Sequence, residues 1–304
     1  MYRFRPLLTT LITVVPLGAA LPAAAQPSGD PWRVRLESGA VHQWQTDLDS
    51  GGDTTVDVWS VLLGVDYSAA PDLRLGLSAG LGERDYSFNG DNGFGGMQPW
   101  SNIRDARLSA SVSWKADDRW NLFAVPTVRW VAEDGASLED GATGGLLAAA
   151  AYQVNDRLSI GPGFGVFSEL EDDVDWFPIL AIDWKLTDTL TLRTGRGFAA
   201  TRGPGLTLDW SPSDRWAVSV GARYEKARFR LDDKGVGPGG IGQERSVPVY
   251  LGATRHFGRH LSVSLVAGVE FAGELRLEDA DGHLIDETDF DNAPFGGATL
   301  DLRF

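Results

Sequence analysis

The chain has 304 residues, no cysteine, 37 glycines and 11 tryptophans, and its formal net charge is −15. This acidic balance excludes a nucleic-acid-binding protein, which needs stripes of basic residues. Without cysteine the fold cannot depend on disulfides, so a buried core or a closed hydrogen-bonded sheet must stabilise it.

The N-terminal segment has the three parts of a secretory signal peptide. Two early arginines form a basic start, residues 7–21 are mainly apolar, and residues 23–25 are alanines that offer a small-residue cleavage site. A membrane-anchoring helix would need about 20 apolar residues, and this run is shorter and contains proline. We therefore expect residues 1–25 to be a cleaved signal peptide, followed by a mature domain over residues 26–304. Cleavage would take the net charge to −17.

After this segment, the longest purely apolar run covers residues 146–152, which is too short to span a membrane as a helix. A soluble exported protein and a transmembrane β-barrel are the two remaining readings. Short turns recur along the chain, each followed at once by alternating apolar and polar residues. They lie at Pro71-Asp72, Asp118-Arg119, Asp156-Arg157, Asp188-Thr189, Asp214-Arg215 and Arg259-His260. Turns of this chemistry indicate consecutive β-hairpins.

The strands between these turns alternate with a period of two. After Asp72, for example, residues 73, 75, 77, 79 and 81 are apolar while residues 74, 76, 78, 80 and 82 are Arg, Gly or Ser. Alternation over this length gives each strand one apolar and one polar face. A soluble antiparallel sandwich alternates as well, so the placement of aromatic residues and loops must decide.

Aromatic residues on the apolar face gather beside the short turns. The predicted membrane-interface aromatics are Tyr67, Trp114, Trp120, Tyr152, Trp184, Trp210, Trp216 and the terminal Phe304. A sandwich would bury such residues in mid-strand, whereas a membrane barrel places them in an interfacial girdle. Trp59, Trp130, Tyr224 and Phe271 fall at the other strand ends and could form a second girdle.

The connections alternate between short turns and long, acidic or glycine-rich loops. The long loops are expected at residues 87–102, 133–141, 232–244 and 274–294. Short periplasmic turns opposite long extracellular loops are typical of outer-membrane barrels. We therefore predict an all-β fold, a transmembrane antiparallel up-and-down β-barrel.

The pattern gives about 14 strands. They are expected to begin near Trp32, Thr54, Leu73, Ile103, Asn121, Thr143, Leu158, Trp176, Leu190, Gly205, Trp216, Arg245, Leu261 and Phe295. An even number leaves both termini on the periplasmic side. The hairpin over residues 190–210 is the weakest because residues 198–204 are irregular, so 12 strands is the alternative.

The last residues carry a family resemblance. Leu300, Leu302 and Phe304 share one face, and Thr299, Asp301 and Arg303 share the other. This ending resembles the C-terminal strand of Gram-negative outer-membrane β-barrels, which the barrel assembly machinery reads. In size and strand number the chain is also similar to fourteen-stranded monomeric porins and to uncharacterised outer-membrane barrels. The resemblance implies localisation in the bacterial outer membrane and names no substrate.

Charged residues on the polar face are expected to face the lumen. The predicted lumen-lining residues are Arg74, Arg107, Arg129, Asp183, Arg193, Asp209, Arg223, Glu225 and Glu270. Facing water, they could line a porin-like passive channel for small hydrophilic solutes. They could instead pair across the lumen and close it, giving a structural or surface-interaction barrel whose acidic loops contact lipopolysaccharide. We expect outer-membrane lipid and lipopolysaccharide as partners, with no nucleic acid; the pattern does not give the oligomeric state.

An enzyme is the third reading, and we expect none. His42 and His256 are the candidate bases, and Ser262 and Ser264 lie near His256 in the predicted hairpin, but no spacing demands a catalytic arrangement. The acidic segment over residues 278–291 fails as an EF-hand, since Leu277 and Thr288 would occupy its first and last ligand positions. We expect no cofactor and no bound metal, with loose cation binding by this segment as the alternative.

Overall fold

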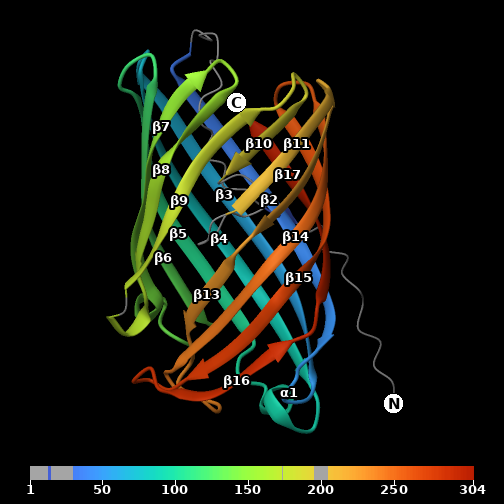
Figure 1. Ribbon diagram of the computed structural model, residues 1–304. Coiled ribbons are helices and arrows are strands. Elements are labelled where there is room, and N and C mark those ends of the chain that lie inside the picture. Colours follow the sequence, from blue (N-terminus) through green and yellow to red (C-terminus); the bar gives the residue numbers. More distant parts are fainter. Residues whose placement is uncertain (1–12, 15–29, 173, 195–204) are drawn as a thin grey trace.

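The computed structural model describes residues 13–14, 30–172, 174–194 and 205–304. Its strands wind into one tall, tilted barrel (Figure 1). The strands are β1 (Thr13–Val14), β2 (Trp32–Asp47), β3 (Asp53–Ala70), β4 (Leu73–Asn89), β5 (Asn102–Lys115), β6 (Trp120–Glu133), β7 (Ala142–Asn155), β8 (Leu158–Ser168), β9 (Val174–Lys185), β10 (Leu190–Thr194), β11 (Gly205–Ser213), β12 (Trp216–Arg223), β13 (Glu225–Arg230), β14 (Ile241–Phe257), β15 (Leu261–Glu278), β16 (Leu284–Phe290) and β17 (Ala293–Arg303). The predicted signal peptide lies outside the described residues, apart from Thr13–Val14.

These elements make the predicted closed barrel of 14 strands. β12 and β13 both pair with β14, so they are one strand interrupted at Tyr224; β16 and β17 both pair with β15 in the same way. The two-residue β1 pairs only briefly with β2. β17 closes the circle by antiparallel pairing with β2, for example Thr299 with Gly39. The alternative of 12 strands is therefore wrong, and the irregular residues 198–204 lie outside the described residues.

The outward face shows why the chain needs a membrane. Leucines in mid-strand are largely uncovered: the exposed fraction is 57% for Leu77, 58% for Leu251 and 63% for Leu265. A single exposed leucine is ordinary, but a continuous apolar band around a barrel needs lipid to cover it. Each of the six predicted turns falls between consecutive strands. No helix among the described residues is long and apolar enough to cross a membrane.

Aromatic side chains frame this band at both edges. Trp114, Trp120, Trp184, Trp210, Trp216 and Phe304 are exposed at the short-turn end, where Tyr152 packs against Trp120 and Tyr67 against Trp32. Trp44, Trp59, Trp176, Tyr224 and Phe271 are exposed at the other edge. The predicted Trp130 is half-buried there.

The spacing between the two girdles fits a membrane. Trp176 and Trp184 on β9 are eight residues apart, as are Tyr224 and Trp216. Eight residues at about 3.4 Å each span ~27 Å, and a strand tilt of about 40° reduces this to a height of ~20 Å. This is close to the apolar band of about 25 Å that is typical of outer-membrane barrels.

Beyond the second girdle, the predicted long loops after β4, β6 and β13 are largely present, whereas the fourth, over residues 274–294, is mostly an extension of strands, which corrects the sequence-based expectation. β15 continues to Glu278 and pairs with β16, so residues 274–290 are largely a hairpin. The loop after β4 contains the helix α1 (Gly93–Met97), and short turns η1 (Leu138–Gly141) and η2 (Leu170–Asp172) lie in two other loops. Phe94, within the predicted loop over residues 87–102, is fully buried.

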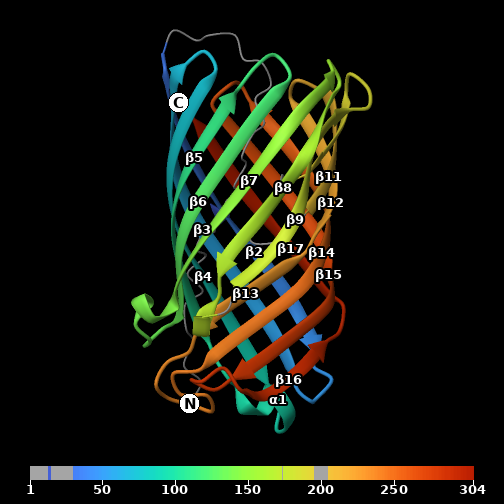
Figure 2. The same ribbon diagram turned by 60° about the vertical axis from the view of Figure 1, so that its left-hand side comes forward.

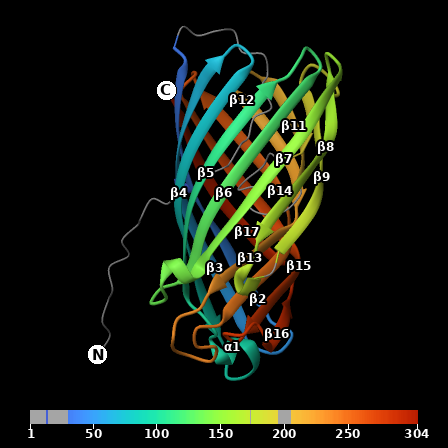
Figure 3. The same cartoon turned by 90° about the vertical axis from the view of Figure 1, so that its left-hand side faces the viewer.

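The barrel narrows at this extracellular end. The last residue of β13, Arg230, pairs in parallel with Ala132 of β6, and Leu48 bridges to Phe290 on the opposite side. The resulting neck is a ring of β2 to β6 and β13 to β16, which leaves out β7 to β12. Figure 2 and Figure 3 show β13 running toward β6, with α1 and β16 at the same end. A ring of about nine strands is narrow enough for side chains to fill it.

Candidate functional site

Charged side chains line the lumen below the neck, and three of the predicted ones form a cluster. Arg193 on β10 lies between two carboxylates, with its Nε 3.2 Å from Asp183 on β9 and its Nη1 3.2 Å from Asp209 on β11. The strand register brings the three together, because Arg193 is directly opposite Asp183. The cluster places one positive charge between two negative ones on the inner wall.

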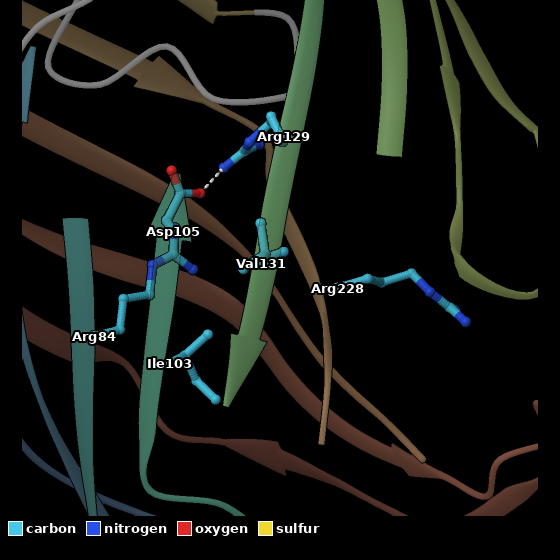
Figure 4. Close-up of a pocket in the computed structure, with 7 residues that line it drawn as sticks. Arg84, Ile103, Asp105, Arg129, Val131 and Arg228 are labelled. Atoms are coloured by element: carbon cyan, nitrogen blue, oxygen red, sulfur yellow. Dashed lines mark hydrogen bonds and ion pairs between the residues drawn. The ribbon is translucent and has the colours of Figure 1, made fainter. Parts of the chain in front are cut away.

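A second group lies on β4, β5 and β6. Arg129 contacts Asp105 at 2.5 Å, and Arg107 is the cross-strand neighbour of Arg129. Arg129 and Asp105 line a small cavity of about 10 Å³ together with Arg84 and Arg228, and the guanidinium end of Arg228 extends away from the Arg129–Asp105 pair (Figure 4). Asp105 therefore lies among three arginines, of which Arg84 is also 3.6 Å from Glu244.

The remaining predicted lumen residues lie in two places. Arg223 pairs with Glu225, and both line a cavity of about 100 Å³ together with Glu270. Arg74 lies near the periplasmic end of β4, apart from these groups. The structure therefore brings most of the predicted charges into three clusters. That they line a conducting path stays a prediction.

The neck is filled by apolar side chains that sequence reasoning missed. They are Leu48, Val56, Tyr86, Phe88, Phe94, Trp100, Ile103, Val131, Phe229, Leu231, Leu275, Leu277, Phe290 and Ala293. We call this set the neck plug. Trp100 is at its centre, with ring centroids 5.2 Å from Phe229, 5.5 Å from Phe94 and 5.6 Å from Phe88. One feature of the sequence could have indicated the neck plug. On β4, Tyr86 and Phe88 lie on the same inward-facing side as Arg74 and Arg84, so two large apolar rings are expected inside the barrel.

The helix α1 that carries Phe94 is fastened to the β2–β3 turn. Ser50 Oγ accepts a hydrogen bond from Phe94 N at 3.1 Å, and Gly51 O accepts one from Gly95 N at 3.1 Å. Gly93 has a φ of +60°, and a Cβ there would lie 1.9 Å from Ser50 O. Only glycine fits this close approach of the two segments. The plug is therefore built on backbone contacts between loops as well as on apolar packing.

The two histidines considered as catalytic bases differ in setting. His256 Nδ1 lies 2.8 Å from Ser262 Oγ on the inner wall near the periplasmic end. His42 is exposed and lies 2.8 Å from Asp57 on the outside. Among the described residues, no carboxylate is hydrogen-bonded to His256, so the third member of a hydrolase triad is missing there.

The acidic segment after β15 forms a tight turn. Asp279 Oδ1 accepts hydrogen bonds from Asp281 N at 2.9 Å and His283 N at 2.8 Å. The bond from the His283 amide is the main reason that the pKa of Asp279 is lowered. Possible ligand atoms of Asp279, Asp281 and His283 lie within 4.8 Å of one another, but all three belong to an exposed turn whose hydrogen bonds already explain their positions.

Comparison with known proteins gives the fold. No model of a known protein family matches the chain, and no curated protein matches it. An outer membrane channel from Pseudomonas putida F1 is similar in structure, with a TM-score of 0.51 and 9% identity over 99% of this chain and 100% of that one. A FadL homologue from Pseudomonas aeruginosa has a TM-score of 0.50 and 12% identity over 90% of each chain. The lipid-facing band, the two girdles and these likenesses together establish that the chain has the fold of bacterial outer-membrane β-barrel channels.

Proposed function

We propose that the protein is a passive outer-membrane channel for small hydrophilic solutes and is not an enzyme. The observation that carries this proposal is the ionic lining of the lumen at the levels of the two girdles. Arg193 with its two aspartates, the Arg129–Asp105 pair and the Arg223–Glu225 pair all project inward. Charged groups on facing walls create a transverse field that favours small polar solutes over apolar ones.

The neck plug gives this channel a closed extracellular end. Trp100 and Phe94 are only 2% and 0% exposed, so their rings leave no water-filled path between them. A dry apolar constriction blocks polar solutes until its side chains separate. In this proposal the wider section holds the solute and the neck plug is the gate.

Liposome swelling tests the proposal without knowledge of the natural solute. Liposomes that contain the refolded mature chain are diluted into isotonic glycerol, alanine or a trisaccharide. We expect swelling with the two small solutes and none with the trisaccharide. If the barrel is folded, as judged by heat-modifiable migration on a gel, and no solute enters, the channel proposal is wrong.

A second candidate is a plugged barrel that acts through surface interaction. One feature favours it: a charged groove of about 550 Å³ beside β13, lined by Lys226, Arg228, Arg245, Arg276 and Glu278 among others. Basic side chains just beyond the Tyr224 girdle lie at the level of phosphate groups in the outer leaflet. This candidate proposes lipopolysaccharide as the partner and gives the lumen no transport role.

Binding of purified lipopolysaccharide to the detergent-solubilised barrel tests this second candidate. Arg245→Gln should weaken binding several-fold, because the Arg245 side chain is 48% exposed at the groove. Arg255→Gln is the matched control, since Arg255 lies 5.0 Å over the Trp216 ring at the periplasmic end. Equal binding by both variants and the unmodified chain would exclude this groove as the contact surface.

A further inference from the structure

A cavity in the described lumen below the neck has features of a ligand site. This cavity of about 100 Å³ lies against β2, β3, β4, β12, β13, β14, β15 and β17. Its polar lining consists of Gln43, Ser60, Arg84, Arg223, Glu225, Glu244, Tyr250 and Glu270. Valines 41, 56, 58 and 266 and Phe295 supply the apolar part of the wall. The site therefore combines charges of both signs with apolar surface.

Two of its three carboxylates already have partners. Glu244 accepts a hydrogen bond from Tyr86 Oη at 2.5 Å and lies 3.6 Å from Arg84 Nη1. Glu225 forms an ion pair with Arg223. Both are neutralised within the wall, so neither needs a ligand.

Glu270 is the exception. Its carboxylate has a hydrogen bond with Ser246 and is attracted by Arg223, but within the described part of the chain no Arg or Lys lies within ion-pair distance of it. A carboxylate held away from bulk water favours a cationic partner. Glu270 is therefore the place in this cavity where a positively charged group would bind.

Gln43 supplies an independent indication of a ligand. Gln43 is 4% exposed and lines the cavity, and its Nε2 has no hydrogen-bond partner among the residues that the structure describes. A buried amide donor without an acceptor is unfavourable and is rare in folded proteins. An acceptor atom on a molecule inside the cavity would satisfy it.

The volume limits the size of that molecule. An engineered apolar cavity of about 150 Å³ holds benzene, which has six non-hydrogen atoms, so a cavity of about 100 Å³ encloses roughly four of them, and one or two further atoms would extend into the lumen. A molecule of this size that carries a cation and an acceptor at opposite ends is a small zwitterion.

We infer that this cavity binds a small zwitterionic amino acid of the size of glycine or alanine. Its ammonium group binds Glu270, its carboxylate accepts a hydrogen bond from Gln43 Nε2, and its aliphatic carbon contacts the valines. The inference rests on the proposed channel function, because it names the class of solute that the channel would hold below its gate.

Equilibrium binding to the refolded, detergent-solubilised chain tests this inference, with labelled alanine as the probe. Methylamine and acetate carry one charge each and are the comparison ligands. We expect alanine to bind at least tenfold more tightly than either. Binding of methylamine as tight as that of alanine would overturn the zwitterion assignment, and no alanine binding at all would mean that the cavity holds water only.

Two variants assign the two ends of the ligand. Glu270→Gln should weaken alanine and methylamine binding at least tenfold and leave acetate unchanged, whereas Gln43→Met should weaken alanine and acetate. Glu274→Gln and Gln153→Met are matched controls outside the cavity and should bind like the unmodified chain. Unchanged alanine binding by both cavity variants would contradict the site. Because binding is measured without a membrane, a barrel that binds alanine but passes no solute would remove the channel proposal and keep the site.

Discussion

The central residue of the neck plug is Trp100, whose indole packs against four other aromatic rings. Besides the three rings named above, Tyr86 lies 5.9 Å away in an edge-on arrangement. Most of the apolar packing in the neck passes through this side chain. The indole Nε1 has no hydrogen-bond partner among the described residues, so the contribution of Trp100 is packing alone.

Trp100→Ala is therefore expected to destabilise the neck strongly. Loss of a fully buried aromatic side chain from a packed core costs about 3–5 kcal/mol. Urea unfolding of the refolded barrel in detergent micelles measures this change. Trp176→Ala is the control, because Trp176 is 69% exposed on the outside and should give a much smaller loss. Similar losses for both would show that Trp100 does not hold a packed plug.

Arg193 is the central residue of the charged cluster that it forms with Asp183 and Asp209 on the inner wall. Arg193→Met would remove the cation that lies between Asp183 and Asp209. Because the Arg193 side chain is 24% exposed, solvent screens part of the repulsion between the two aspartates, and we expect a loss of about 1–2 kcal/mol.

Asp183→Asn in the Arg193→Met background removes one of the two negative charges and should restore about half of this loss. The same urea titration in micelles measures it. A double variant as unstable as Arg193→Met would show that like-charge repulsion is not the cause.

At the scale of elements, the short turns explain how the barrel is kept in register. Asp117 caps the β5–β6 turn, where its Oδ1 accepts hydrogen bonds from Arg119 N at 2.7 Å and Trp120 N at 2.8 Å. These backbone bonds lower the pKa of Asp117 from its ordinary value of 3.8. A carboxylate that is bound in this way stabilises the turn only while it is ionised.

The lowered pKa of Asp117 determines how the effect of Asp117→Ala on stability depends on pH. The stabilisation is fully present above pH 3.8 and is lost as the pH falls through the lower folded value. Asp117→Ala should therefore lower the urea midpoint at pH 7 and have a smaller effect at pH 2. Asp117→Asn keeps a neutral acceptor, so its difference from the unmodified chain should reverse in sign or vanish at low pH. A constant effect of Asp117→Ala at both pH values would contradict the turn assignment.

The C-terminal strand is the element that we propose the barrel assembly machinery binds. Phe304 is 70% exposed in the periplasmic girdle, and its backbone exchanges two hydrogen bonds with Val34 at 2.9 and 3.0 Å. Deletion of Phe304 should reduce the amount of heat-modifiable barrel in the outer membrane several-fold. Phe257→Ala removes another exposed girdle aromatic and is the control. Equal assembly of both variants would show that the terminal position has no special role.

At the scale of the whole molecule, the membrane-spanning section could be predicted from the sequence and the neck could not. Strict alternation after Asp72 and the aromatics beside each turn reflect local pairing, which a period of two reveals. The pairing of Arg230 with Ala132 joins strands that are far apart in the chain, so no local pattern indicates it. The same pairing turns Phe229 into part of the plug. The inward parity of Tyr86 and Phe88, like that of Val56 on the neighbouring strand, was a local sign that the lumen becomes apolar.

For the predicted charged residues, too, one part of the arrangement could be predicted from local sequence and another part could not. Their inward parity follows from alternation, but the grouping of Arg193 with Asp183 and Asp209 depends on the register of three strands. Gln43 was not predicted as a site residue, because an isolated glutamine in a strand carries no pattern. Its significance comes from burial and from its missing partner, which only the closed barrel defines.

Single-channel conductance in a planar bilayer tests the central claim, that the neck plug gates a polar channel. The unmodified chain should give rare, small steps, and Phe94→Ala/Trp100→Ala should raise the frequency or size of the steps several-fold. Trp176 lies in the extracellular girdle on the outside of the barrel, so Trp176→Ala should behave like the unmodified chain. Silence from the folded plug variant, or conductance identical to that of the unmodified chain, would contradict the account.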